Sequence, residues 1–162
     1  MIVVSNTSPI TNLAAIGQFD LLQRLFGELH VSASVFQELA ASGVEWAGYN
    51  DVKQAAWVAI DEVTDPHLVD ALRLDLDRGE AETIVLALQL GADLVLLDER
   101  AGRLAAQHFD LKVMGVIGIL VRCKQLGYIT TIRPLLDELR QRAGFYIDQA
   151  LYNHALKLAL ES

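Results

Sequence analysis

Residues 78–103, RGEAETIVLALQLGADLVLLDERAGR, change from a helical pattern of apolar positions to a strand pattern. In the first half, apolar residues recur at helical spacing: Ala81, Ile84, Val85 and Leu88. Gly91 follows them, at the position where a helix commonly ends. Residues 94–97 are all apolar, as expected of a strand that is covered on both faces. Asp98 and Glu99 end this run, so an acidic pair follows a predicted buried strand.

This pattern predicts that acids from a helix and from a strand lie at one edge of a sheet. In an open parallel sheet, ligands bind beyond the carboxyl ends of the strands, where Asp98 is expected. The preceding helix runs antiparallel to the strand, so its first turn, with Glu80 and Glu82, is expected near the same edge. Successive helical residues differ by about 100 degrees, so at most one of these glutamates faces the site squarely. Their alternative role is to complement the helix dipole.

Apolar runs and helical periodicities alternate along the rest of the chain. Further strands are expected at residues 1–5, 29–31, 57–60 and 112–114. Helices are expected from Ser8 as cap and Pro9 as first residue up to Gly17, at 19–26, 69–76, 101–109, 115–126 and 148–160, and after Ser32 or Ser34 and Thr130 or Thr131. Residues 43–51 fit a loop or the start of another helix. Together these elements predict one α/β domain over residues 1–162, a three-layer α/β/α sandwich around a mainly parallel sheet of about five strands.

Two further polar side chains are expected near the same edge. Asn6 directly follows the first predicted strand, as Asp98 follows its own. Glu38 lies on a predicted helix beside apolar Val35 and Leu39, and taken alone it fits an exposed helix carboxylate. Converging carboxylates repel one another unless protons or cations offset their charge. Hard oxygen ligands suit Mg²⁺ or Mn²⁺, ions that activate water and stabilise charge in phosphodiester cleavage.

The composition narrows the chemistry. Asp and Glu outnumber Lys and Arg, 21 against 13, and the net charge of −8 argues against broad nucleic-acid binding through a basic surface, without excluding a metal-dependent nuclease. There is no HExxH, CxxC, GxGxxG, GxSxG or phosphate-loop motif, and the four histidines are not spaced as zinc ligands. The single cysteine, Cys123, excludes an internal disulfide. Without a signal peptide or a run long enough to span a membrane, the protein is expected to be cytoplasmic.

Several stretches, taken in their order and spacing, resemble the PIN-domain family, in particular its prokaryotic branch of small, toxin-like proteins. They are IVVSNTSPI, VSASVFQELA, RGEAETIVLALQLGADLVLLDERAGR, MGVIGILVRCKQLGYI and the closing GFYID with the helix after it. The resemblance therefore covers nearly the whole chain. It implies an α/β/α sandwich and an endonuclease that cleaves single-stranded RNA with Mg²⁺ or Mn²⁺. It also implies the toxin of a toxin–antitoxin pair, a small antitoxin protein as partner, and a homodimer.

The resemblance also implies the site residues. The positions of the family's acids, which bind metal and serve catalysis, correspond to Asn6, Glu38, Glu80 and Asp98. Glu82 is the alternative to Glu80, and Glu99 is either an additional metal ligand or a surface acid. Thr7 and Ser8 match hydroxyl residues that follow the first acid and position a metal-bound water or a phosphate.

The sequence departs from the family pattern at Asn6, where an amide replaces an acid. An amide oxygen can coordinate Mg²⁺, but it brings no negative charge and cannot act as a base, so weaker metal binding and reduced or lost activity are expected. In a nuclease, Arg100 and Arg103 are expected to guide the nucleic-acid strand. Two other classes stay open: a catalytically weak PIN-like protein that acts through protein–protein contacts, and an α/β phosphate-binding domain without hydrolysis. The second lacks the glycine-rich loop that such domains usually carry.

Overall fold

The computed structural model describes residues 1–41 and 49–161. They contain a sheet of five strands in the order β3-β2-β1-β4-β5. The strands are β1 (Val3–Ser5), β2 (Leu29–Ser32), β3 (Val58–Asp61), β4 (Leu94–Leu96) and β5 (Val113–Met114). All four pairings between neighbouring strands are parallel. The mainly parallel sheet predicted from the sequence is thereby confirmed.

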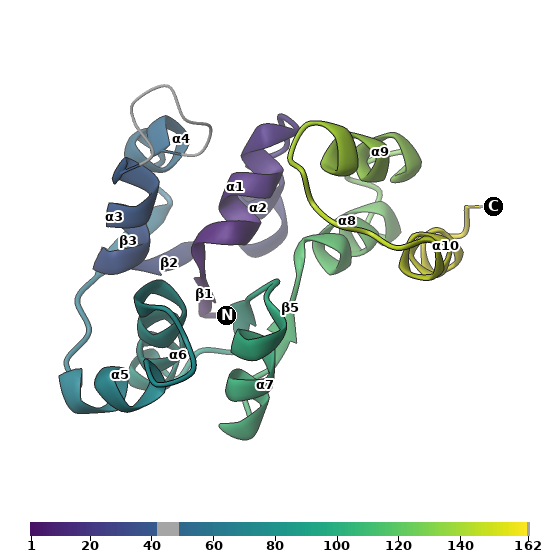
Figure 1. Cartoon of the computed structure of the whole chain (residues 1–162). Coiled ribbons are helices and arrows are strands. Elements are labelled where there is room, and N and C mark those ends of the chain that lie inside the picture. Colours follow the sequence, from purple (N-terminus) through teal and green to yellow (C-terminus); the bar gives the residue numbers. More distant parts are fainter. Residues whose placement is uncertain (42–48, 162) are drawn as a thin grey trace.

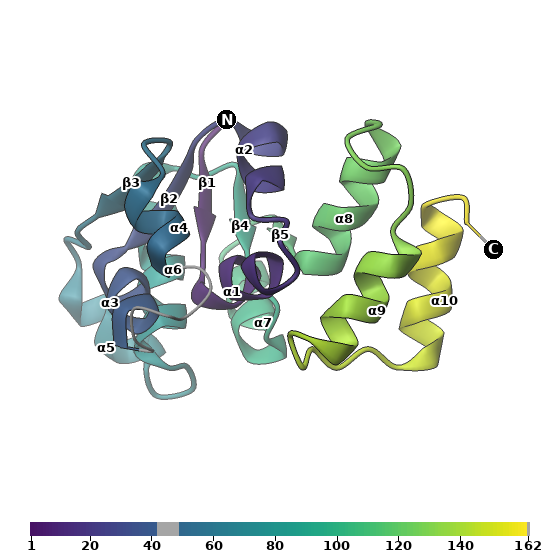
Figure 2. The same cartoon turned by 90° about the horizontal axis from the view of Figure 1, so that it is seen from above.

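Helices cover both faces of this sheet (Figures 1 and 2). One apolar core is shared by α1 (Thr7–Ala15), α2 (Asp20–Phe26), α3 (Ala33–Ala41), α4 (Tyr49–Gln54), α8 (Val116–Gln125), α9 (Arg133–Gln141) and α10 (Gln149–Leu158). The other core is shared by α5 (Pro66–Leu72), α6 (Arg78–Leu90) and α7 (Arg100–His108). The predicted three-layer α/β/α sandwich is confirmed. No helix in the described part of the chain is long and apolar enough to cross a membrane.

The two cores explain the apolar runs of the central strands. Val3 and Leu96 belong to the core on one face, whereas Val4 and Val95 belong to the core on the other face. All four side chains are fully buried. Because successive strand residues alternate between the faces, a strand covered on both faces has no place for a polar side chain until it ends.

The strand order decides which polar strand ends meet. The chain moves outward from β1 to β2 and β3, and then returns to β4 on the other side of β1. The Asn6 N–H donates to the carbonyl oxygen of Leu96 (3.0 Å), which extends the pairing of β1 with β4 to the end of both strands. Asn6 and Asp98 therefore follow neighbouring strands at the switch point of the sheet, where open α/β sheets bind their ligands.

Helix α6 begins and ends as its sequence predicts. The Asp77 side chain accepts a hydrogen bond from the Glu80 N–H (2.8 Å), and the Glu80 carboxylate accepts one from the Asp77 N–H (3.2 Å). These reciprocal bonds form a capping box. At the other end, Gly91 adopts a left-handed conformation with φ of 63°. The helix then leads back into β4, so its first turn lies at the carboxyl edge of the sheet.

Helix α1 begins earlier than predicted. Asn6 is its N-cap and is still extended, with ψ of 176°, so Thr7 is the first helical residue. The prediction of Ser8 as cap and Pro9 as first helical residue is therefore wrong, because the strand passes directly into the helix. For α3, Ser32 rather than Ser34 is the cap, since its hydroxyl accepts from the Val35 N–H (3.1 Å).

Two other helix starts also differ from the predictions. Helix α5 begins at Pro66 rather than at residue 69, because Asp65 caps it by accepting from the Leu68 N–H (3.1 Å). Helix α9 begins at Arg133, with Ile132 as its N-cap, so neither predicted threonine caps it. Of the stretch predicted as a loop or helix start, residues 43–48 lie outside the described residues, and α4 begins at residue 49.

The start of α9 is held by Glu161, which follows α10 near the end of the chain. The Glu161 carboxylate accepts hydrogen bonds from the Ile132 N–H (2.7 Å) and the Arg133 N–H (3.3 Å), and it pairs with the Lys124 Nζ (3.2 Å). Burial alone would raise the pKa of Glu161, but these hydrogen bonds and the Lys124 charge bring it below its ordinary value. Glu161 thus joins α8, α9 and the end of α10.

We expect Glu161→Gln to lower the free energy of unfolding by about 1–2 kcal/mol at neutral pH, because the amide loses the charge that these donors meet. The pKa of Glu161 is lower in the folded than in the unfolded chain, so its contribution is present above the unfolded value of 4.5 and is lost as pH falls through the folded value. Urea unfolding at neutral and acidic pH tests this, and the difference between variant and wild type should shrink in acid.

The matched control is Glu138→Gln on α9. Glu138 is a half-exposed partner of Arg142 at 3.9 Å, so its loss should change stability little. Equal effects of the two substitutions at neutral pH would contradict the role assigned to Glu161.

Candidate active site

A cavity of about 510 Å³ lies at the carboxyl edge of the sheet, where the first turns of α1, α6 and α7 approach α3. Its lining residues are Asn6, Thr7, Ser8, Thr11, Glu38, Asp77, Glu80, Glu99, Arg100 and Ala101. A second cavity of about 350 Å³ shares Ser8, Thr11 and Glu99 with the first and also reaches Asp98. The structure therefore brings most of the predicted site residues to one edge of the sheet.

Asn6 is buried at the junction of β1 and α1, with 4% of its surface exposed. An asparagine at an N-cap usually accepts a hydrogen bond from its own helix, but the Asn6 side chain makes no such bond. Among the described residues, two buried side-chain oxygens lack a hydrogen-bond partner: Asn6 Oδ1 and Asp98 Oδ2. Buried polar atoms without a partner are rare and costly, so a ligand is expected at each of these two oxygens.

Glu38 is half-buried and forms part of the cavity wall. Its Oε2 accepts a hydrogen bond from the Thr7 hydroxyl (2.6 Å), and the Gly79 N–H at the start of α6 also donates to its carboxylate. A Cβ at position 79 would collide with this carboxylate, so the approach depends on glycine. Burial raises the pKa of Glu38, against the effect of the Thr7 hydrogen bond. Glu38 is therefore not simply the exposed helix carboxylate that the sequence alone allowed.

Glu80 lines the same cavity from the first turn of α6 and is 7% exposed. One carboxylate oxygen accepts from the Asp77 N–H, and the other faces Gly102 in the first turn of α7, where a Cβ would lie 3.0 Å away. Burial raises the pKa of Glu80 to about 7; the Asp77 N–H lowers it and the Asp77 charge raises it. A cation bound beside this carboxyl would lower its pKa again.

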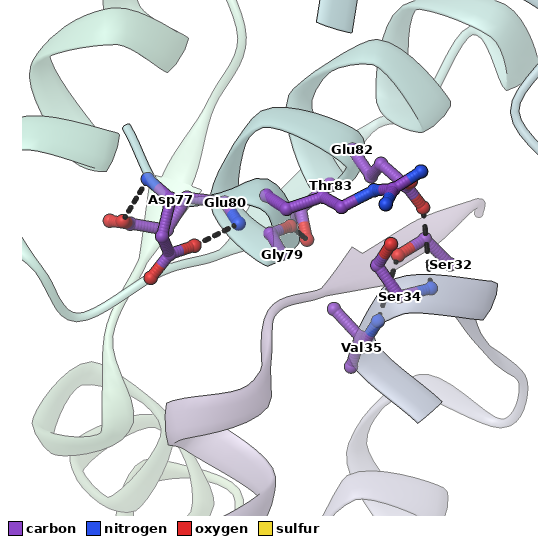
Figure 3. Close-up of polar contacts among 9 residues, drawn as sticks. Ser32, Ser34, Val35, Asp77, Gly79, Glu80, Glu82 and Thr83 are labelled. Atoms are coloured by element: carbon purple, nitrogen blue, oxygen red, sulfur yellow. Dashed lines mark hydrogen bonds and ion pairs between the residues drawn. The ribbon is translucent and has the colours of Figure 1, made fainter. Parts of the chain in front are cut away.

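Glu82 points to the opposite side of α6 from Glu80 (Figure 3). Its Oε1 accepts from the Ser34 N–H (3.3 Å) in the first turn of α3, and its Oε2 pairs with the Arg78 Nε (3.3 Å). It lines a different cavity, together with Glu62. The divergence of the two glutamates is as predicted, and Glu80 is the one that reaches the candidate site.

Asp98 follows β4 and is held by the start of α8. Its Oδ1 accepts from the Val116 N–H (2.8 Å), and a Cβ at Gly115 would lie 2.7 Å from the same oxygen. Burial raises the pKa of Asp98 to about 6, while the Val116 N–H and the Arg103 charge lower it. Arg103 also donates to the Leu97 carbonyl oxygen (3.2 Å), so it lies beside Asp98, and it does not line the 510 Å³ cavity.

The remaining predicted residues lie on the outer side of the site. Glu99 and Arg100 are exposed and line the 510 Å³ cavity. Thr7 and Ser8 are half-buried in the first turn of α1, and Ser8 lines both cavities. The site thus combines a buried acidic floor with one arginine at its mouth.

A family model described as a PIN domain matches residues 2–161. The chain belongs to the PIN-domain family. PIN domains are generally nucleases that act on RNA or DNA with divalent metal ions, so this chain has a nuclease-type fold. No curated protein sequence matches the chain significantly. The family predicted from the sequence is confirmed, while its toxin-like branch stays a prediction.

The oxygen atoms at the candidate site of this PIN domain suit a hard cation. Within the described residues, no three His, Cys, Asp or Glu side chains form a preformed metal site by themselves. Instead, Glu38, Glu80 and Asp98 each accept a hydrogen bond from the backbone N–H of a helix start. The partnerless oxygens of Asn6 and Asp98 are nevertheless ligands of the type that Mg²⁺ and Mn²⁺ prefer. We therefore regard the residues present as fitting a divalent ion.

Sequence reasoning missed some residues that shape this PIN-domain site. Asp77 lines the cavity, and its spacing to Glu80, Asp-x-x-Glu, is a capping-box pattern that could have identified it. The contact of Asp98 with Val116 spans 18 residues and leaves no signal in the sequence. Gly79 and Gly115 give no signal of their own in the sequence, and only the fold shows the carboxylates packed against them.

We expect Gly115→Ala to lower the free energy of unfolding by about 1–3 kcal/mol, the usual range for overpacking. The new Cβ would lie 2.7 Å from Asp98 Oδ1 and 2.9 Å from Arg103 Nη1, so the buried carboxylate or its partner must move. In an Asp98→Ala background the same substitution should cost less, because the carboxylate is gone. Urea unfolding of the four proteins gives this double-mutant cycle, and strict additivity would refute the contact.

Proposed function

We propose that this protein is a divalent-metal-dependent endonuclease of single-stranded RNA and the toxin of a toxin–antitoxin pair. One observation carries the nuclease part: Asn6 Oδ1 and Asp98 Oδ2 are buried, lack partners, and follow neighbouring strands at the switch point of the sheet. Glu38 and Glu80 line the cavity that Asn6 also lines. This is an oxygen-rich site in a family of nucleases.

In this proposal, Asn6, Glu38, Glu80 and Asp98 hold a Mg²⁺ or Mn²⁺ ion. When bound, such an ion supplies activation of water and neutralisation of phosphate charge. Glu99 is exposed at the mouth of the cavity and suits an additional contact through water. Glu82 is not included, because its oxygens are engaged by Ser34 and Arg78 on the other side of α6.

The other residues of the site orient the acids and the substrate. The Thr7 hydroxyl fixes Glu38, and the first turn of α1 presents Ser8 and backbone N–H groups that suit a phosphate oxygen. Arg100 is exposed at the cavity, and we assign it to guiding the RNA strand. Arg103 is engaged by the Leu97 carbonyl and the Asp98 charge, so we assign it to positioning Asp98.

We further propose that this protein forms a homodimer and that a small antitoxin protein binds it. A cavity of about 610 Å³ extends from Asp98 and Arg103 towards α10. Apolar side chains such as Ile117, Val121 and Leu151 line it, as suits a protein segment better than a nucleic acid. A segment bound there would end beside Asp98, which supports inhibition by occupation of the site.

The second candidate function is a PIN domain that acts mainly through protein–protein contacts. The observation in its favour is the amide at position 6. Because an acid is expected there in this family, the site has one negative charge fewer than the family pattern. In this interpretation, Asp98 and Glu80 have a structural role only, because their carboxylates accept hydrogen bonds from helix starts. The cleavage experiment below separates the two functions.

The first test is cleavage of a labelled, mixed single-stranded RNA pool with Mg²⁺, with Mn²⁺ and with EDTA. We expect metal-dependent cleavage that Asp98→Asn lowers at least about tenfold, because this substitution removes a charge at the metal. Asp70→Asn on α5, an exposed acid away from the cavity, is the matched control and should cleave as wild type does. No cleavage with either metal by folded protein would favour the interaction module.

The second test adds back the missing charge. Asn6→Asp is expected to bind Mn²⁺ about tenfold more tightly or better, because a second anionic ligand then faces the ion from the switch point. Titration calorimetry of both forms measures this. Asn153→Asp on α10 makes the same charge change at an exposed position and should leave the affinity unchanged. Equal Mn²⁺ affinity of wild type and Asn6→Asp would exclude Asn6 as a ligand.

A further inference from the structure

Tyr146, on the connection between α9 and α10, is an aromatic side chain that the fold itself does not use. It is 83% exposed, whereas its neighbours Phe145 and Ile147 are packed into the core. Among the described residues, no hydrogen bond, ion pair or ring contact involves the Tyr146 side chain. Its ring therefore contributes little to the stability of the fold and is available to a ligand.

The backbone that carries Tyr146 is fixed on both sides. Gly144 takes a φ of 65° as the chain leaves α9, and the Phe145 N–H donates to the Leu139 carbonyl oxygen (2.9 Å). After Tyr146, the Ile147 carbonyl oxygen accepts two hydrogen bonds from the Arg140 guanidinium group (2.8 and 3.2 Å). The exposed ring thus stands on a preorganised segment, which lowers the entropy cost of binding against it.

The ring lies at the candidate active site. Figures 1 and 2 show the connection between α9 and α10 beside α1. Tyr146 lines the 350 Å³ cavity together with Ser8, Asp98 and Glu99. A ligand that extends outward from Asp98 and Ser8 along this cavity meets the Tyr146 ring.

The negative charge of the site indicates which kind of contact could bind a nucleic acid at Tyr146. The chain carries a net charge of −8, and the cavity walls are acidic, so phosphate attraction alone gives a nucleic acid little affinity. Stacking of a base on an aromatic ring does not depend on charge, and it is available only to an unpaired base. An exposed tyrosine on a fixed backbone beside the acidic candidate site fits this requirement.

We propose that Tyr146 is a stacking platform for one unpaired base of the RNA strand, next to the phosphodiester at Asp98. This inference rests on the proposed nuclease function, since it requires a single-stranded nucleic acid in the site. It adds a binding subsite that selects unpaired over paired strands, and it assigns the GFYID segment a role in substrate recognition.

The test measures binding of labelled single-stranded RNA to full-length Asp98→Asn protein with Mg²⁺, in which cleavage is suppressed. Tyr146→Ala and Tyr146→Leu should each weaken binding about 5- to 100-fold, because leucine keeps apolar area but offers no ring face. Tyr146→Phe should bind nearly as tightly as the parent. Leu74→Ala, at a position that is 86% exposed and away from both cavities, is the control and should have no effect.

A scan with RNA that lacks one base at a time identifies the stacked position. At one position, loss of the base should weaken binding to the parent but not to Tyr146→Ala, because that interaction is already absent. If the parent binds RNA and every Tyr146 variant binds equally well, the stacking platform is refuted while the nuclease proposal stands. If neither Asp98→Asn nor wild type binds or cleaves RNA, both proposals fail together. Loss of binding to a protein partner alone would assign Tyr146 to protein contacts instead.

Discussion

Acids at the carboxyl edge of the sheet are held by backbone N–H groups of helix starts, and the geometry of the site depends on this interaction. Helices α3 and α6 exchange such contacts: Glu82 accepts from the Ser34 N–H, and Glu38 accepts from the Gly79 N–H. Asp98 accepts from the Val116 N–H of α8 in the same way. Helix starts carry unsatisfied donors and a partial positive charge, so they stabilise carboxylates that burial would otherwise penalise. The acids thus fix both the helix positions and the cavity between them.

This arrangement gives the amide at position 6 a physical meaning. Asn6 is the one member of the proposed ligand set whose side chain accepts no hydrogen bond at all, although it is almost fully buried; Asp98 accepts one on Oδ1. A carboxylate there would place another negative charge at the same edge as Asp98, and the start of α1, which Asn6 caps, would offset it only in part. An amide avoids that repulsion in the metal-free protein, at the expense of attraction for a cation. Under the proposed function, an amide at position 6 therefore favours the stability of the metal-free site over affinity for a cation.

The sequence determines much of this fold and part of the site. Helix α6 and β4 follow from long, regular patterns, and the divergence of Glu80 and Glu82 follows from helical geometry alone. The strand order and the contact of Asp98 with Val116 depend on packing between distant segments, which no local pattern encodes. The predicted start of α9 is wrong for the same reason, because Glu161 rather than a nearby threonine accepts from its N–H groups. Local capping signals fail where a distant side chain supplies the cap.

Helices α9 and α10 lie to one side of the sheet (Figures 1 and 2), yet the connection between them reaches the site. Glu161 fixes the start of α9, and Arg140 near its end holds the Ile147 carbonyl oxygen. These contacts determine where the segment with Tyr146 leaves α9 and passes beside α1. In an acidic domain that cannot rely on a basic surface, affinity for a nucleic acid must come from a few directed contacts. Under the proposed function, helices α8–α10 hold such a contact in place at the site, so their packing would serve the function as well as the fold.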